Sequence, residues 1–142
     1  NLMDRTQLLW TEATLRAASE PWKICYFHHP LYSDAGRHGS NLDLRVVIEP
    51  LLVRYGVQVA LSGHEHVYER IKPQKGITYF VAGSGGQLRK GDLQPSPDTA
   101  AGFDTDRAFM LVEITDTTFS FKTISRTGVV VDSGAIRRPG TT

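Results

Sequence analysis

Residues 57–66 read Val-Gln-Val-Ala-Leu-Ser-Gly-His-Glu-His, a short apolar run that ends in two histidines. The apolar run is typical of a buried β-strand, and Gly63 lets the backbone turn tightly where the strand ends. A second segment of the same kind lies upstream, where residues 23–27 (Lys-Ile-Cys-Tyr-Phe) lead into His28 and His29. Four of the five histidines in the chain therefore come directly after a predicted strand.

A helix is predicted between these two strands. Apolar side chains recur there at spacings of three and four, as on one face of an amphipathic helix; they are Leu44, Val47, Ile48, Leu51, Leu52 and Tyr55. Pro50 should kink this helix because its ring crowds the carbonyl of Val46, and Gly56 is suited to end it. A further helix is expected over about residues 5–18, with Asp4 and Gln7 forming a capping box. Apolar strands joined through helices are typical of a parallel sheet that helices cover.

The second half of the sequence predicts further strands. Strands are expected at 77–81, 107–114, 118–125 and 129–136. Short turns connect the last three, so these are expected to pair antiparallel. Residues 83–106 are rich in Gly, Pro, Asp and Ser and read as a long loop that is either functional or mobile. The expected fold class is therefore α/β in one domain over residues 1–142, with parallel strands first and antiparallel strands at the C-terminal end.

The composition and net charge of the chain argue against some classes of function. The chain has 142 residues, of which 40% are hydrophobic and 22% charged, as in an ordinary globular protein. A net charge of +1 gives no argument for binding nucleic acid or an anionic membrane. The single cysteine, Cys25, excludes an internal disulfide and is expected to be a small buried apolar side chain. Because the chain begins at Asn1 and enters a helix almost at once, we expect a piece of a longer polypeptide or a processed product.

The strand-end histidines are expected to form a metal site. In parallel α/β sheets, ligands collect at the carboxyl ends of the strands. His28, His64 and His66 follow two strands that one crossover helix joins, so the three imidazoles can converge. Imidazole is the commonest protein ligand for transition metals. In an extended segment His64 and His66 would point to one side and Glu65 to the other. For any one of these histidines, the alternative is a hydrogen-bonded side chain without a metal.

Several motifs resemble those of the calcineurin-like metallophosphoesterases. Gly-His-Glu-His at 63–66 is similar to the last ligand motif of that family, and Tyr-Glu-Arg at 68–70 resembles the purple acid phosphatases within it. Phe-His-His-Pro-Leu-Tyr at 27–32 resembles the preceding motif. The likeness continues through 7–15 and 79–86 and into the final strands, so it covers nearly the whole chain. It implies the C-terminal half of a β-sandwich flanked by helices.

The resemblance also implies roles for individual histidines. His28 and His64 would bind one ion of a dinuclear metal centre and His66 the other, the metals being Fe, Zn or Mn. His29 would lie outside the metal ligands. His38 would act catalytically, by contacting the substrate phosphate or protonating the leaving group. A surface histidine without a role is the alternative for His38.

Other motif residues are expected to be structural. Tyr68 and Arg70 should pack and form ion pairs. Residues 83–86 should make a tight turn after a strand, although their amides could also bind an anion. Trp10 and Trp22 should lie in the core or at its boundary.

The carboxylates that would balance two metal ions are missing from this predicted site. Two metal cations need carboxylate ligands, and one carboxylate must bridge both ions. In the family, the missing ligands come from three upstream motifs: Asp-x-His, Gly-Asp-x-x-Asp (or Gly-Asp-x-x-Tyr) and Gly-Asn-His. None of these motifs occurs in the sequence. We therefore expect hydrolysis of phosphate monoesters only when an N-terminal half or a complementing chain is present, with this chain inactive alone.

Two alternatives remain open at this point. One is a catalytically inactive fragment or binding subunit with a partial metal site, and the other is a phosphodiesterase or nucleotidase of the same superfamily. A sheet that lacks neighbours exposes an edge, which favours a homodimer. Only the resemblance bears on localisation, and it favours a secreted or periplasmic protein.

Overall fold

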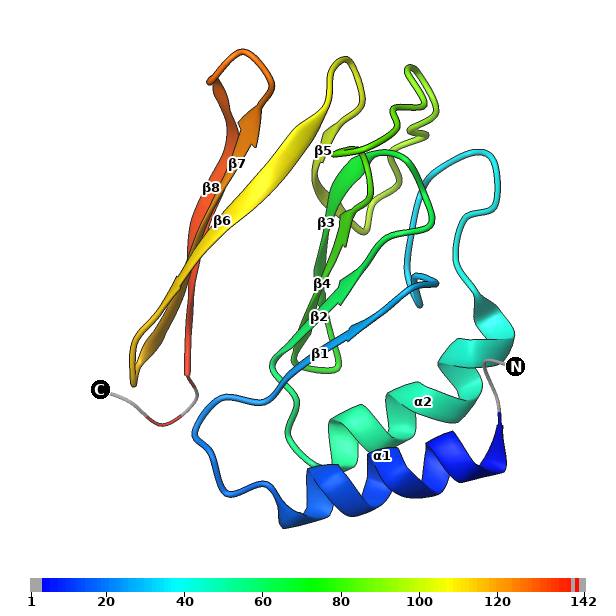
Figure 1. Ribbon diagram of the computed structural model, residues 1–142, viewed down its shortest axis with the longest axis vertical. Helices are drawn as coiled ribbons and strands as arrows, with labels where there is room; N and C mark the ends of the chain where they lie inside the picture. The colour runs from blue at the N-terminus through cyan, green and yellow to red at the C-terminus, as the bar shows by residue number, and fades with distance from the viewer. Residues whose placement is uncertain (1–3, 139, 141–142) are drawn as a thin grey trace.

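The computed structural model describes residues 4–138 and 140 (Figure 1). Three layers lie side by side: a pair of helices, a five-stranded sheet and a three-stranded sheet (Figure 1). The elements follow one another as α1 (Arg5–Ala17), β1 (Ile24–Phe27), α2 (Leu42–Arg54), β2 (Val59–Ser62), β3 (Tyr68–Gln74), β4 (Ile77–Ala82), β5 (Thr99–Phe103), β6 (Ala108–Ile114), β7 (Thr118–Ser125) and β8 (Val130–Arg137). The α/β fold class predicted from the sequence is confirmed.

The five-stranded sheet contains the two strands predicted to be parallel, β1 and β2. Its order is β1-β2-β4-β3-β5, and β4, for which no parallel pairing was predicted, also runs parallel to β2. In this register Phe27 pairs with Ser62, so both strands end at the same edge of the sheet. The crossover through α2 thus brings the two histidine segments together, as the topology predicts.

Two strands of this sheet were not predicted. β3 pairs antiparallel with β4 on one side and with β5 on the other. The sequence of β3 reads Tyr-Glu-Arg-Ile-Lys-Pro-Gln. Charged residues and proline are uncommon in strands, so this segment was not recognised as one. β5 reads Thr-Ala-Ala-Gly-Phe, whose small residues have low intrinsic strand preference. Pairing with neighbouring strands, not local sequence, makes these segments extended.

The three-stranded sheet confirms the predicted antiparallel strands. Its order is β6-β7-β8, with Ala108 opposite Ser125 and Thr118 opposite Arg137. The sheet faces the five-stranded sheet across an aromatic cluster; its buried members are Val59, Tyr68, Phe80, Phe119 and Phe121. Trp22 packs against this cluster, so its predicted place at the core boundary is confirmed.

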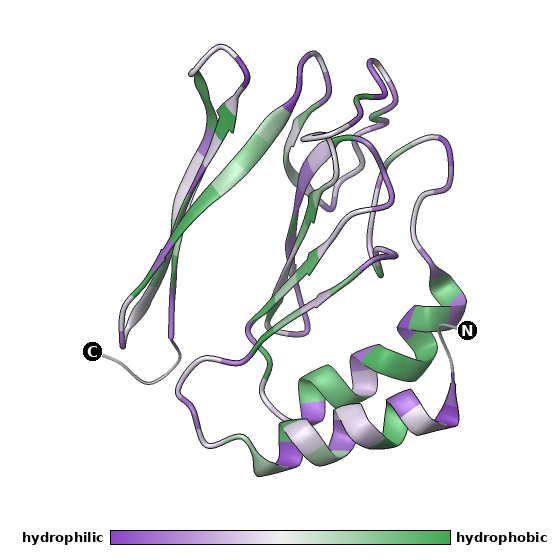
Figure 2. Cartoon of the chain, in the orientation of Figure 1, coloured by the Kyte–Doolittle hydropathy of each residue, from purple (hydrophilic) through white to green (hydrophobic). Residues whose placement is uncertain are grey.

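The helices cover the other face of the five-stranded sheet. Asp4 caps α1 as predicted, although its carboxylate accepts from the backbone N–H of Thr6 (2.9 Å) and not from Gln7. Pro50 lies inside α2, where the kink stays a prediction, and Figure 2 shows α2 as predominantly hydrophobic. In α1 only Leu15 is fully buried, and Trp10 is 65% exposed, so the prediction of Trp10 as a core or boundary residue is wrong. Leu15 is the residue of α1 that joins the buried cluster beneath the helices, whereas Trp10 lies on the exposed side of the helix.

Cys25 is half-buried and packs against the cluster beneath the helices, and burial raises the pKa of its thiol. A raised pKa keeps a thiol protonated and unreactive, in line with the predicted structural role. Within residues 4–138 and 140, no helix has both the length and the apolar content to cross a bilayer.

Candidate metal site

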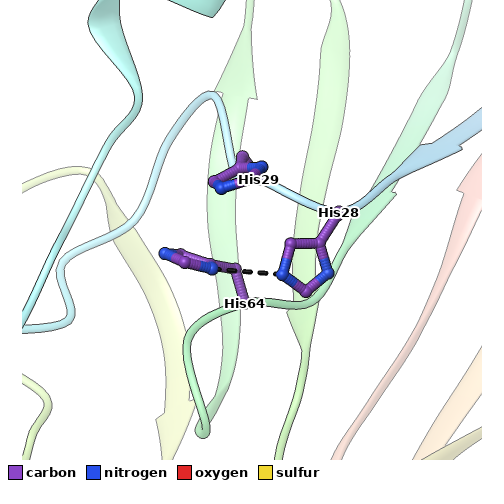
Figure 3. A group of neighbouring side chains, drawn as sticks. All are labelled: His28, His29 and His64. Atoms are coloured by element: carbon purple, nitrogen blue, oxygen red, sulfur yellow. Dashed lines mark hydrogen bonds between the residues drawn. The ribbon is translucent and has the colours of Figure 1, made fainter. Parts of the chain in front are cut away.

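The carboxyl ends of β1 and β2 bring His28 and His64 into contact. The backbone N–H of Gly63 donates to the carbonyl of His28 at 3.1 Å, which ties the two strand ends together. Nε2 of His28 and Nδ1 of His64 lie 3.1 Å apart, and one of them donates to the other (Figure 3). The structure therefore brings these two predicted ligands together, while their binding of a metal stays a prediction.

His29 also belongs to this group. Its ring lies over that of His64, with 4.3 Å between the ring centroids (Figure 3). One ring nitrogen from each of His28, His29 and His64 lies within 4.8 Å of the others. The family resemblance argued against His29 as a ligand, and only the ring positions in three dimensions bring it into consideration.

His64 and His66 do not lie in an extended segment as the sequence predicted. His64 has a φ of +64°, in the left-handed region, and residues 64–67 form a bend. Alternation of side chains therefore does not apply here. Among the described residues, His66 belongs to neither group of side chains close enough to share an ion. Its Nδ1 is nevertheless buried without a hydrogen-bond partner.

Glu65 does not point away from the site, so that prediction is wrong. A carboxylate oxygen of Glu65 lies within 4.8 Å of a ring nitrogen of both His38 and His64. The side chain is fully buried, and its Oε2 accepts a hydrogen bond from Arg89 at 3.1 Å. The bend at His64 turns Glu65 toward the histidines, which no periodicity in the sequence indicated.

Gly83 holds the bend in place through a close backbone approach. A Cβ at position 83 would lie 2.0 Å from the carbonyl oxygen of Glu65, a distance that no side chain tolerates. The backbone N–H of Gly83 also donates to the carbonyl of Val67 at 3.0 Å. The turn at 84–86 follows β4 as predicted.

His38 reaches the site from the loop that follows β1. It is exposed, and its ring centroid lies 4.7 Å from that of His64. The two side chains line a cavity of about 420 Å³. The remaining lining residues are His29, Gly39, Ser40, Asn41, Leu42 and Asp43. The predicted catalytic histidine therefore lies beside a predicted metal ligand, at the wall of an open cavity.

A buried carboxylate anchors the loop that carries His38. Glu69 is 0% exposed, and it accepts hydrogen bonds from the hydroxyl of Ser33 (3.0 Å) and the backbone N–H of Asp34 (2.9 Å). Burial raises the pKa of Glu69 to about 7. The Asp34 carboxylate in turn accepts from the hydroxyls of Ser96 and Thr99. The segment predicted as a long loop thus packs on the His38 loop and contains β5.

The other residues of the Tyr-Glu-Arg motif are structural, as expected. Tyr68 donates its hydroxyl hydrogen to Asp132 at 2.7 Å. Arg70 binds both oxygens of Asp132, at 2.8 and 3.1 Å. These bonds join β3 of the larger sheet to β8 of the smaller one.

The donor groups at this edge suit a transition metal ion. Burial and the neighbouring imidazoles lower the pKa values of His29 and His64, which favours their neutral, metal-binding form. Nδ1 of His29, Nδ1 of His66 and Oε1 of Glu65 are all buried without a hydrogen-bond partner. Imidazole nitrogens with a carboxylate oxygen are ligands of Zn²⁺ and similar ions.

Comparison with known proteins agrees with this chemistry. Residues 1–68 match the calcineurin-like phosphoesterase family. The chain is 37% identical over 81 residues to tartrate-resistant acid phosphatase type 5 of Oryctolagus cuniculus, covering 57% of this chain and 25% of the relative. It is 31% identical over 113 residues to purple acid phosphatase 4 of Arabidopsis thaliana, covering 78% of this chain and 33% of the relative.

The fold also occurs in a protein described as an anchor. GAP50, the anchor in the inner membrane complex of Plasmodium, superposes with a TM-score of 0.83 at 19% identity, over 96% of this chain and 42% of that protein. The chain spans between a quarter and a third of the length of the two phosphatases. The fold alone therefore does not decide between an enzyme and a binding protein.

Proposed function

Since this chain is a relative of the calcineurin-like phosphoesterases, with purple acid phosphatases among its matches, we propose that it carries part of the active site of a metal-dependent phosphatase. The substrate class is phosphate monoesters. The observation that supports this most is the 3.1 Å approach of His28 and His64 at the carboxyl edge of the parallel sheet.

In this proposal the histidines hold a dinuclear metal centre. His28 and His64 bind one ion and His66 the other, with Fe, Zn or Mn as the metals. When bound, the ions polarise the phosphate and lower the pKa of a coordinated water. The unpartnered Nδ1 of His66 supports its role, because a buried ring nitrogen without a partner is energetically costly.

His38 contacts the substrate. It lines the cavity of about 420 Å³ beside His64, and its exposed ring can turn toward a bound phosphate. As imidazolium it would hydrogen-bond a phosphate oxygen or give a proton to the leaving group. A cavity of this size is within the range of small-molecule sites.

The remaining ligands come from outside this chain. Two metal ions need carboxylate ligands, and among the described residues Glu65 is the only carboxylate in either group of potential ligands. The chain matches only 25% of the rabbit phosphatase and 33% of the Arabidopsis enzyme. We therefore assign the bridging carboxylate to an N-terminal half, in the same polypeptide or in a complementing chain.

Hydrolysis of p-nitrophenyl phosphate with added Mn, Fe or Zn tests the proposal. We expect turnover when the polypeptide that carries the upstream ligand motifs is present, and none by this chain alone. His64→Ala should abolish the turnover, while Lys122→Ala, on the exposed surface of β7, should leave it unchanged. Equal turnover by wild type and His64→Ala would contradict the proposal.

A binding subunit with a partial metal site is the second candidate. The likeness in fold to the Plasmodium protein GAP50 favours it. That protein is described as an anchor in the inner membrane complex and not as an enzyme. A complemented protein that binds metal yet turns over no phosphate ester would support this candidate over the first.

A further inference from the structure

A second cavity, of about 470 Å³, lies along α2 and shares no lining residue with the cavity beside His38 and His64. Its walls come from the start of the His38 loop, from one side of α2 and from the turn between β3 and β4. The lining residues are Tyr32, Arg45, Val46, Glu49, Pro50 and Lys75. None of them belongs to the proposed metal or substrate contacts, and two of them are cationic.

Arg45 presents a guanidinium without an acidic partner to this cavity. Its Cζ lies 4.2 Å from the centroid of the Tyr32 ring. No carboxylate forms an ion pair with Arg45 in the part of the chain that the structure describes. A cation–π contact positions the guanidinium and leaves most of its N–H donors for an acceptor. The planar fork of an arginine matches the paired oxygens of a phosphate or carboxylate.

Lys75 supplies the second cation. Its ammonium binds Oε2 of the buried Glu49, while its side chain is 62% exposed. Oε1 of Glu49 accepts from the hydroxyls of Tyr32 (2.6 Å) and Tyr79 (3.2 Å). Burial raises the pKa of Glu49, but the hydrogen bonds from Lys75 and Tyr32 outweigh it and leave the pKa below its ordinary value. Because one ionised carboxylate faces two cations, the cavity keeps a net positive charge.

The backbone of Lys75 adopts a conformation that lysine seldom takes. Its φ is +51°, in the left-handed region, within the two-residue turn that joins β3 to β4. Asn and Gly adopt this conformation at lower cost. The costly conformation lets the ammonium of Lys75 reach α2, where it lies at the wall of the cavity.

One face of α2 connects the two cavities. Leu42 lines the cavity beside His64, whereas Val46 and Glu49 line the second one. Residues four and seven positions apart lie on the same face of a helix, and Val46 lies about 6 Å further along the axis than Leu42. The side chains of Leu42 and Val46 are 54% and 74% exposed, so this face offers apolar surface to a ligand that reaches both cavities.

We propose that Arg45 and Lys75 bind a second anionic group of the substrate while its phosphate ester lies beside His38 and His64. The substrate class then narrows to phosphate monoesters that carry a further phosphate or carboxylate about one helical turn away. The carbon part that joins the two groups lies over Leu42 and Val46. The link to the substrate rests on the proposed function, whereas anion binding at Arg45 and Lys75 does not.

Pyrophosphate, added to the isotope-labelled and metal-free chain at constant ionic strength, tests the anion site by itself. We expect nuclear magnetic resonance to show shifts at the backbone amides of Arg45, Lys75 and Gly76. Arg45→Gln should weaken the binding of pyrophosphate roughly 10-fold or more, because charge-assisted hydrogen bonds are lost.

Arg54→Gln is the matched control. Arg54 also lies on α2, with its Cζ 5.5 Å from the centroid of the Tyr55 ring, but it does not line the cavity. This variant should bind pyrophosphate like the wild type. Lys75→Asn removes the ammonium and keeps a residue that suits the left-handed backbone, so it should weaken binding as Arg45→Gln does. If circular dichroism shows Lys75→Asn to be unfolded, Arg45→Gln decides the outcome.

Two esters of equal carbon chain length test the link to the substrate. After correction for its two phosphates, hexanediol bisphosphate should be hydrolysed by the complemented protein with a kcat/KM about 10-fold above that of hexyl phosphate. Arg45→Gln should bring this ratio close to one, whereas Arg54→Gln should keep it.

Absence of amide shifts around Arg45, or equal pyrophosphate affinity of wild type and Arg45→Gln, overturns the anion site. A kcat/KM ratio that Arg45→Gln leaves unchanged overturns the link to the substrate, even where pyrophosphate binds. If the complemented protein hydrolyses neither ester, the proposed function is wrong, and the pyrophosphate titration still decides the anion site.

Discussion

The carboxylate of Glu69 accepts the backbone N–H of Asp34 through both of its oxygens, at 2.9 and 3.1 Å. This contact joins β3 to the loop that carries His38, and no cation pairs with Glu69 in the bonds that the structure shows for it. Burial outweighs the hydrogen bonds and raises the pKa of Glu69 to about 7, from an ordinary value of 4.5. The ionised form is therefore disfavoured in the folded state.

Glu69 should make stability depend on pH. A carboxyl group with a raised pKa binds its proton more tightly when folded, so its stabilising contribution is full below pH 4.5 and is lost as pH rises toward 7. The loss corresponds to about 3 kcal/mol, from ~1.4 kcal/mol for each pKa unit. Urea denaturation between pH 4.5 and 8 should show this fall in the wild type and not in Glu69→Gln.

The difference between these two proteins is the quantity to compare, since it isolates the contribution of Glu69 from that of every other ionisable group. Glu113→Gln serves as the control, because it removes an exposed carboxylate. A wild type and a Glu69→Gln variant with parallel pH profiles would show that Glu69 titrates as an ordinary carboxyl group.

Gly83→Ala should disrupt the bend that presents Glu65. The added Cβ would lie 2.0 Å from the carbonyl oxygen of Glu65, so one of the two backbone segments must move. We expect a loss of at least ~1–3 kcal/mol in the free energy of unfolding, as for overpacked sites, together with weaker metal binding. Gly86→Ala is the matched control, because a Cβ there meets no atom within 4 Å. Equal stability of the two variants would contradict this role of Gly83.

Asp132→Asn should weaken the connection between the two sheets. Asp132 is largely buried, with a side chain that is 9% exposed, and it binds both Arg70 and Tyr68. Removal of one partner of a buried ion pair leaves the other uncompensated and typically costs about 3–5 kcal/mol. Thermal and urea denaturation measure this loss.

Asp106→Asn is the comparison for that variant. Asp106 pairs with Arg126, whose side chain is 68% exposed, and exposed pairs contribute little to stability because water and salt screen them. Similar losses in the two variants would mean that the Asp132 cluster does not stabilise the contact between the sheets.

The open edge at β1 should promote self-association. β1 is the outermost strand of its sheet, and Tyr26 on it is 85% exposed. Exposed strand edges with large apolar side chains favour pairing with another chain. We expect light scattering to show a dimer that Tyr26→Lys dissociates, while Val46→Lys on the exposed face of α2 leaves it intact. A monodisperse monomer at high concentration would refute this prediction.

Much of the fold could be predicted because its signals are local. The apolar runs before His28 and His64, with a helix between them, are sufficient to predict parallel pairing of β1 and β2, and the structure confirms it. The turns near residues 116 and 127 likewise predicted the antiparallel sheet. β3 and β5 escaped prediction because their sequences have weak strand character and they become extended only by pairing with each other and with β4.

The site was predictable only in outline. The meeting of His28 and His64 follows from topology, whereas the place of Glu65 depends on the left-handed backbone of His64. A non-glycine residue adopts that conformation only where its surroundings stabilise it. Here the surroundings include Gly83 and Arg89, which come from later segments of the chain.

The sequence by itself determined which elements form and which histidines end the parallel strands, because periodicity, turn residues and strand connectivity are encoded in neighbouring positions. Only the tertiary structure decided that Glu65 turns toward His38 and that Glu69 anchors the His38 loop. These contacts join segments that are distant in the chain, and the burial and hydrogen bonds that stabilise them exist only once the sheets and loops have packed together.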